Sequence, residues 1–175
     1  EKLVAAMQTL DRSKGQEHGF IVADFAHPQQ VKEAIENYLE KKSSIHILVN
    51  NTGGPAGGTA LDATLDEFRQ AFNAHLICNH ILVQALVPGM KTEGYGRIIN
   101  IISTSVKQPI AGLGVSNTIR AAVASWSKTL AGELGKFGIT VNNVLPGFTK
   151  TVRADYVVKK KAETAGKTEE IVMKE

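Results

Sequence analysis

The stretch Gly96-Arg97-Ile98-Ile99-Asn100-Ile101-Ile102-Ser103, together with the residues that follow it to Leu134, decides the fold of this chain. Its isoleucine-rich first half is almost uninterrupted, which is typical of a parallel strand covered on both faces. After the hydroxyl-rich Ser103-Thr104-Ser105, apolar residues recur at helical spacing from Ile119 until Gly135 offers a stop signal. A strand, a crossing loop and an amphipathic helix therefore follow one another, and open α/β sheets bind ligands where such strands end.

Three further strands are predicted from short apolar runs. Residues 19–23 end at Asp24, residues 45–49 lead into Asn50-Asn51-Thr52-Gly53, and residues 139–145 end in Pro146-Gly147. The glycines that follow residue 52 allow a neighbouring molecule to approach the backbone closely. We therefore expect these strand ends to form one polar edge of a sheet.

Helical periodicity links the predicted strands. We expect helices over residues 1–10, 28–39, 64–87, 117–134 and 152–165, and a last helix that starts after Thr168. Pro28 at a first helical position, a capping box of Thr64 with Glu67, a Pro88-Gly89 stop and a cap at Thr151 support these boundaries. Strands that alternate with such helices indicate an α/β fold with a parallel sheet.

Composition indicates one globular domain, which we expect to span residues 1–175. The 20 basic and 17 acidic residues give a net charge of only +3, which gives nucleic-acid binding little support. No apolar run approaches the roughly 20 residues that cross a membrane. The one cysteine, Cys78, excludes an internal disulfide and a CxxC metal site and indicates a reducing, cytoplasmic setting; we predict no metal. Because a helical pattern starts at once at Glu1, we also expect further sequence before it.

Several motifs, in this order, resemble those of the short-chain dehydrogenase/reductase family. Asn50 to Gly53 resembles its Asn-Asn-Ala-Gly signature, Gly96 to Ser103 resembles its Gly-Arg-Ile-Val-Asn-Ile-Ser-Ser strand, and Ile139 to Thr151 resembles its Ile-Thr-Val-Asn-x-Val-x-Pro-Gly segment. The resemblance implies a Rossmann-type doubly wound parallel sheet in three αβα layers that uses NAD or NADP. It also implies that a phosphate-binding βα unit before Glu1 and a strand after Glu175 are absent, so that the domain is incomplete at both ends.

The resemblance also implies roles for individual residues. Ser103 matches the catalytic serine, and cofactor contacts are implied for Asp24, Asn50, Asn51, Gly53, Arg120, Pro146, Gly147 and Thr151. The chain is most similar to divergent relatives of β-ketoacyl-acyl-carrier-protein reductases, because the family's tyrosine and lysine fall on Ser116 and Arg120 and its helix asparagine falls on His75. A small carbonyl or alcohol substrate follows from this likeness. A homo-oligomer, dimer or tetramer, is also expected, with helices 64–87 and 117–134 meeting through Ala71, Cys78, Ala121 and Ala131.

Ser116, Arg120 and His75 differ from the family's tyrosine, lysine and asparagine, and these differences change what the site can do. A phenol starts near pKa 10 and is lowered by a nearby ammonium, whereas the hydroxyl of Ser116 is a far weaker acid. Arg120 stays protonated, so it can donate hydrogen bonds to ribose or to a developing alkoxide but cannot relay a proton. His75 titrates near 6.5 when unperturbed, and beside a cation its pKa should fall. We therefore take His75 as the candidate proton relay.

Simpler interpretations stand beside these. Ser116 would serve equally as a helix N-cap, Arg120 as a surface or interface cation, His75 as a core histidine bonded to a backbone carbonyl, and Asp24 as a strand-end cap. Gly53 to Gly58 would also suit a plain surface loop. At the level of function, the alternatives to an active reductase are a nucleotide-binding sensor that has lost its chemistry and a structural subunit of an oligomer.

Overall fold

The computed structural model describes residues 1–41, 44–147, 149, 158–159, 162–163 and 166–174. They fall into two compact units, Glu1–Val144 and Leu145–Glu175. In the second unit the structure shows the short helix α7, Glu169–Lys174, where a helix was expected after Thr168. Thr151 and most of the helix predicted over 152–165 lie outside the described residues. The candidate site residues up to Arg120 all belong to the first unit.

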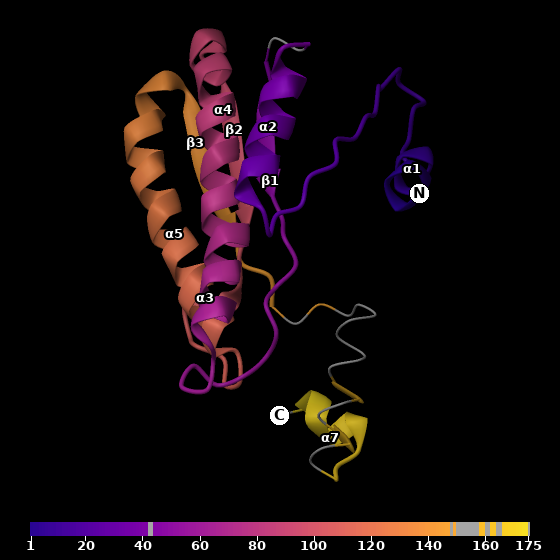
Figure 1. Ribbon diagram of the computed structural model, residues 1–175, viewed down its shortest axis with the longest axis vertical. Coiled ribbons are helices and arrows are strands. Elements are labelled where there is room, and N and C mark those ends of the chain that lie inside the picture. The colour runs from indigo at the N-terminus through magenta and orange to yellow at the C-terminus, as the bar shows by residue number, and fades with distance from the viewer. Residues whose placement is uncertain (42–43, 148, 150–157, 160–161, 164–165, 175) are drawn as a thin grey trace. The chain divides into compact units, whose positions relative to one another are not determined.

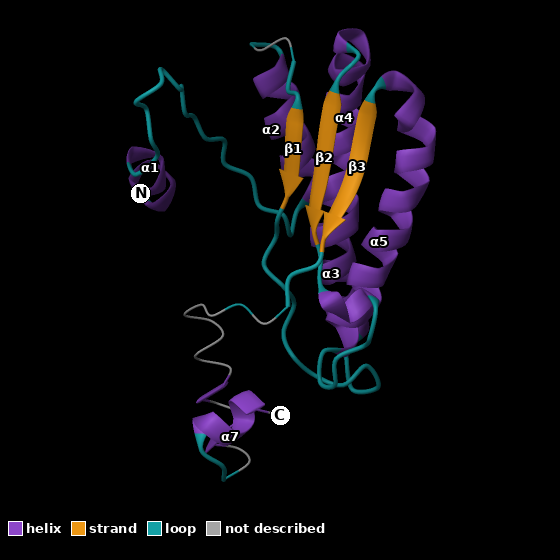
Figure 2. Ribbon diagram, turned by 180° about the vertical axis from the view of Figure 1, so that it is seen from behind, coloured by secondary structure: helices purple, strands orange, loops and turns teal. Residues whose placement is uncertain are grey.

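Three parallel strands form the sheet of the first unit. They are β1 (Ile47–Asn50), β2 (Gly96–Ile101) and β3 (Ile139–Val144), and they lie side by side in the order β1-β2-β3. All three arrows point the same way in Figure 2, so the three loops that leave the strands start from one edge. The predicted parallel α/β fold is confirmed at these three runs.

Helices lead into and connect the strands. Helix α2 (Pro28–Leu39) precedes β1, and α5 (Gly114–Leu134) connects β2 to β3. Between β1 and β2, three segments follow one another without a break: α3 (Leu65–Phe72), the π-helical turn η1 (Asn73–Ile77) and α4 (Cys78–Glu93). Helix α1 (Lys2–Gln8) has no buried residue. Pro28 at a first helical position and the Thr64–Glu67 capping box are both present. Figures 1 and 2 show α2, α4 and α5 on one face of the sheet.

The core lies between these helices and the sheet. Val83, Leu86 and Met90 of α4 pack there with Ile98 of β2 and Ile139 of β3. On the opposite face, Ile47 and Val49 of β1 remain more than half exposed. Among the described residues, the helix layer therefore covers one face of the sheet. No described helix is both long enough and apolar enough to cross a membrane.

The strand predicted over residues 19–23 is wrong. The segment forms no ladder with any described strand, and Phe20, Ile21 and Val22 are exposed. Apolar composition favours a strand, but a strand also needs a neighbour to accept and donate its backbone hydrogen bonds. Asp24 consequently follows a loop and not a strand end.

Two predicted helix boundaries are also corrected. Helix α4 runs through Pro88 and ends only where Gly94 turns left-handed, with φ 64°. A proline costs the helix one N–H donor, and here the helix continues for a further turn despite that loss. Helix α5 begins at Gly114 with Leu113 in the N-cap position, so Ser116 is an internal residue of the first turn and the N-cap interpretation of Ser116 fails. The other end agrees with the expected stop, because α5 ends at Leu134 with Gly135 as its C-cap; the left-handed glycine is Gly138, after the short turn η3 (Gly135–Phe137).

Candidate active site

Arg120 connects the carboxyl ends of two neighbouring strands. Its Nη1 donates to the carbonyl of Ile101, the last residue of β2, at 2.8 Å, and its Nη2 lies 3.5 Å from the carbonyl of Thr52, which follows β1. The side chain comes from the second turn of α5 and is only 9% exposed. The interpretation of Arg120 as a surface cation is therefore wrong.

His75 lies in the same cluster. The hydroxyl of Thr52 is 2.5 Å from its Nδ1, and the ring is 2% exposed within the π-helical turn η1. The pKa of His75 is lowered to about 4, chiefly by burial and in addition by the charge of Arg120, while a hydrogen bond with the Gly53 backbone opposes the shift. The predicted fall in the pKa beside a cation is borne out in direction. His75 is consequently a neutral hydrogen-bonding group near pH 7, which also suits the core-histidine interpretation.

Ser103 follows the end of β2 by two residues, and Ile102 separates it from Ile101, whose carbonyl binds Arg120. Its backbone is extended and its Oγ accepts a hydrogen bond from the backbone N–H of Ser105, at 3.0 Å, which caps the short turn η2 (Thr104–Val106). Because that bond uses Oγ as an acceptor, the hydroxyl proton is still able to donate to a substrate oxygen. Ser116, half-buried, sits one turn before Arg120 on α5.

Asn50 is part of a buried ladder of amides. Asn50, Asn100 and Asn143 occupy the same level of β1, β2 and β3. Asn50 Nδ2 donates to Asn100 Oδ1 at 2.8 Å, and Asn100 Nδ2 donates to Ser127 Oγ of α5 at 2.9 Å and to Asn143 Oδ1 at 3.3 Å. The side chain of Asn50 thus holds the strands together, while Asn51 beside it is exposed.

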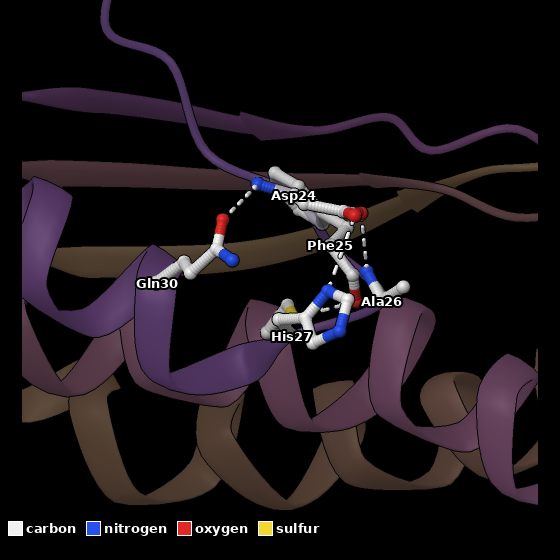
Figure 3. A network of polar contacts seen from close by, with 6 residues as sticks. Asp24, Phe25, Ala26, His27 and Gln30 are labelled. Carbon is white, nitrogen blue, oxygen red and sulfur yellow. Dashed lines mark hydrogen bonds and ion pairs between the residues drawn. The ribbon is translucent and has the colours of Figure 1, made fainter.

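Asp24 lies in a separate, exposed network, drawn in Figure 3. Its Oδ1 accepts from the backbone N–H of Ala26 at 2.9 Å, its Oδ2 lies 3.1 Å from Nδ1 of His27, and Gln30 Oε1 accepts from its backbone N–H at 3.3 Å. The Ala26 N–H and His27 lower the pKa of Asp24, so it is a carboxylate at neutral pH. None of these hydrogen bonds or ion pairs includes His75 or Arg120.

A cavity of about 280 Å³ adjoins the His75 cluster. Gly53, Pro55 and Ala56 of the loop after β1 line one side of it, α3 and η1 line another, and it extends to Ala26 and to Val115 of α5. The glycine-rich loop therefore borders a cavity beside His75, which the plain-surface-loop interpretation did not foresee. Pro146 and Gly147 belong to the second unit, and Thr151 lies outside the described residues. The described residues hold no group of three side chains suited to a metal ion.

Sequence reasoning missed Thr52, Asn100 and Ser127. Thr52 stands where the family signature has alanine, and His75 stands where it has asparagine; the structure shows that these two departures are partners. Because both residues differ from the family pattern, the sequence offered one signal that Thr52 belongs to the site. Asn100 lies inside an apolar run and Ser127 lies on helix α5, and only the packing of α5 against the sheet reveals that they meet.

Comparison with known proteins places the chain among dehydrogenases. Residues 1–162 match the sequence profile described as short chain dehydrogenase. Trans-4-hydroxycyclohexanecarboxylate dehydrogenase of Sinomonas cyclohexanicum is 37% identical over 75% of this chain and 51% of its own length. A protein of Streptomyces violaceoruber, assigned as a ketoacyl reductase of granaticin polyketide synthase, is 30% identical over 90% of this chain and 58% of its own length.

Solved structures agree with this placement. L-sorbose reductase from Gluconobacter frateurii, complexed with NADPH and L-sorbose, superposes with a TM-score of 0.85 at 30% identity, over 93% of this chain and 62% of its own. A gluconate 5-dehydrogenase from Burkholderia cenocepacia, in complex with NADP and tartrate, gives a TM-score of 0.73 at 25% identity, over 82% and 56%. The chain spans about half to two thirds of the length of the relatives it matches.

Proposed function

Because the chain belongs to the short chain dehydrogenase family, we propose that it is an NAD(P)-dependent oxidoreductase that interconverts a carbonyl and an alcohol. We further propose that it resembles 3-oxoacyl reductases but works with atypical catalytic residues. The observation that carries this proposal is the joining of two strand ends by Arg120, which brings Thr52, His75 and the segment leading to Ser103 to one edge of the sheet. Ligands of open α/β sheets bind at that edge.

The described residues fit part of a dinucleotide. Buried polar atoms without a partner remain at Asn50 Oδ1, Ser105 Oγ and Arg120 Nε, and a cavity borders Gly53. We propose that Asp24, Asn51, Gly53 and Arg120 contact the cofactor, with Asn50 supporting the loop from behind. Pro146, Gly147 and Thr151 remain proposed contacts at the nicotinamide end. The bound cofactor would supply or accept a hydride at the substrate carbon.

The side chains have separate roles in the proposed reduction, in which the carbonyl carbon gains a hydride and its oxygen gains a proton. Ser103 donates a hydrogen bond that orients the oxygen, and the guanidinium of Arg120 stabilises negative charge as it develops there. His75 relays the proton, with Thr52 as its hydrogen-bonded neighbour. Ser116 occupies the tyrosine position but is too weak an acid to replace it, so we assign it a hydrogen bond to the substrate only.

The pH profile of turnover tests this assignment. If the charged imidazole of His75 is the proton donor, reductive turnover should decline as the pH rises above about 4, because the donor form disappears above its pKa. His75→Asn should lower kcat and flatten that limb, and Arg120→Ala should reduce both turnover and cofactor binding. Full turnover with an unchanged profile in His75→Asn would remove histidine from the mechanism.

A second candidate function is a dinucleotide-binding protein without turnover. The favouring observation is that Ser116 and a largely neutral His75 offer no strong acid near pH 7. Oxidation of NADPH with a panel of 3-oxoacyl thioesters, followed by absorbance, separates the two functions from each other. At NADPH concentrations well above about 1 mM, binding of cofactor without any consumption would favour the sensor, and absence of both would favour a structural subunit.

A further inference from the structure

Arg120 is a buried cation, and no acidic side chain of the described chain compensates its charge. The ion pairs found among the described residues, Asp24–His27, Lys32–Glu36 and Asp66–Arg69, all lie at exposed positions and do not include Arg120. Burial lowers the pKa of Arg120, but a guanidinium remains charged at any physiological pH. Buried charges in proteins are normally paired, so this one leaves a positive potential in the site.

The hydrogen bonds of Arg120 leave one edge of the guanidinium little used. Nη1 donates to Ile101 at 2.8 Å, whereas Nη2 makes a longer contact of 3.5 Å with Thr52, and Nε is buried without a hydrogen-bond partner among the described residues. The Nε and Nη2 donors point in parallel along the same edge. That edge has the geometry with which arginine binds the two oxygens of a carboxylate.

The surroundings leave this edge close to the cavity. Nη2 would lie 3.9 Å from a Cβ placed on Gly54, so the loop after β1 passes over the guanidinium, and its neighbours Gly53 and Pro55 line the cavity with His75. His75 is neutral and neither competes for an anion nor supplies one. Glu67 also lines the cavity, but its carboxylate binds the backbone N–H and the hydroxyl of Thr64 at 2.7 and 2.9 Å.

We propose that the Nε–Nη2 edge of Arg120 binds a carboxylate carried by the substrate, as in a small oxo acid or hydroxy acid. This inference rests on the proposed oxidoreductase function. A carboxylate one or two carbons from the reacting carbon lets a single guanidinium contact both the carboxylate and the reacting oxygen. A permanent anion also satisfies the buried Nε and the buried charge together, which an uncharged ribose hydroxyl does not.

Binding of acetate to the 175-residue chain, without cofactor, tests the carboxylate site directly. In ¹⁵N-resolved NMR at constant ionic strength, acetate should shift the Arg120 Nε–H and the His75 ring resonances along a saturable curve. Acetamide, the neutral isostere, should not. A linear drift, or an equal response to acetamide, would overturn the proposal. So would loss of the acetate response in the presence of NADP, because that result would assign the edge to the cofactor.

Two lysine variants show whether arginine geometry is responsible. Arg120→Lys keeps the charge but loses the planar edge, and it should weaken acetate binding at least about tenfold, read from the His75 resonances. The matched control is Arg97→Lys, because Arg97 also donates to two backbone carbonyls, those of Gly96 and Gly138, but comes from β2 at the other end of the strand. Equal weakening in both variants, or in neither, would contradict the assignment. If Arg120→Lys does not fold, the acetate and acetamide comparison decides alone.

Turnover separates this inference from the proposed function. With NADPH well above about 1 mM, because the chain is expected to bind it weakly, the chain should reduce a short oxo acid with at least about tenfold higher kcat/KM than the methyl ester of the same acid. Comparable reduction of acid and ester would leave the oxidoreductase function standing and overturn the carboxylate site. Saturable acetate binding without reduction of either compound at that NADPH concentration would support the carboxylate site and remove the oxidoreductase function.

Discussion

His75 makes the stability of the protein depend on pH at the scale of one residue. Its pKa falls from 6.5 to about 4 on folding, so between these values the unfolded chain binds more protons. Stability should therefore be complete above about pH 6.5 and decline as the pH drops toward 4, by up to about 3 kcal/mol. Urea unfolding from pH 4 to 7 measures this. His75→Asn, which cannot titrate, should flatten the profile in that window.

Thr52 supplies the control for this prediction. If the ring proton sits on Nε2, the Thr52 hydroxyl donates to Nδ1 and favours the neutral ring. Thr52→Val should then raise the pKa of His75, and Thr52→Ser should restore it. A pH profile that stays the same in His75→Asn as in the parent protein would mean that other groups produce the acid sensitivity.

Individual residues show where sequence reasoning succeeded and where it stopped. The direction of the shift in the His75 pKa was predicted because the family pattern placed a cation beside it, but burial is the larger cause and belongs to the core-histidine interpretation. The contact with Thr52 was not predicted, since residues 23 positions apart meet only through the loop geometry after β1. Asn50 was expected at the cofactor, but its burial depends on partners in two other strands that no local pattern announces.

At the scale of elements, the amide ladder fixes how the three strands align. Asn100 is 1% exposed and bonds to Asn50, Asn143 and Ser127 at once. Asn100→Ala should cost about 3 kcal/mol of unfolding free energy, because it leaves buried amide and hydroxyl groups without partners. Asn142→Ala, at an exposed neighbouring position, should change stability by less than about 0.5 kcal/mol. Equal effects in urea melts would argue against the ladder.

The close contact between the loop after β1 and the start of α5 gives a second element-scale prediction. Gly58 and Leu113 form an isolated bridge, with Gly58 N–H donating to Gly112 and Gly114 N–H donating to Gly58. A Cβ on Gly114 would lie 2.3 Å from the backbone nitrogen of Ala60, so Gly114→Ala should destabilise the fold by at least about 1 kcal/mol.

Gly132→Ala is the matched control for this contact. It lies in the same helix with open space around it, so the substitution should be neutral or stabilising by up to about 1 kcal/mol. Thermal denaturation of both variants measures the difference. If Gly114→Ala left the stability unchanged, the loop after β1 and the start of α5 would separate easily, and the bridge between Gly58 and Leu113 would not hold them together.

The elements also show which signals were sufficient. The run Arg97 to Ile101 and the Thr64–Glu67 capping box carried enough local information to place β2 and α3. The segment 19–23 has the composition of a strand, but pairing is a property of two segments and cannot be read from one. Pro88 looked like a helix stop, yet Val87 and Met90 on either side of it are buried in the core, and that packing outweighs the lost hydrogen bond.

At the scale of the whole molecule, we propose a homo-oligomer formed through α4 and α5. Ala71 and Cys78 are buried inside the protomer and cannot serve in a contact between copies, whereas Ala121 is exposed and Ala131 is half-buried on α5. Light scattering should report a dimer or tetramer, and Ala121→Glu should shift it toward monomer. Lys136→Glu, after the end of α5, is the control. A monomer at high concentration would reject this proposal.

Dinucleotide affinity also depends on the whole molecule, and we predict that the 175-residue chain binds NAD and NADP weakly, with Kd above about 1 mM. Pyrophosphate is normally bound where a glycine-rich turn runs directly from a strand into a helix N-terminus. Among the described strands, β1 is followed by a long loop to Thr64 and β2 by a loop to Gly114, so neither provides that turn.

Calorimetric titration of the chain with each dinucleotide measures this affinity, and adenosine provides a control ligand without phosphates. Micromolar binding of NADP would place the phosphate site within residues 1–175, and our assignment of Asp24, Asn51 and Gly53 to the cofactor would then have to be revised.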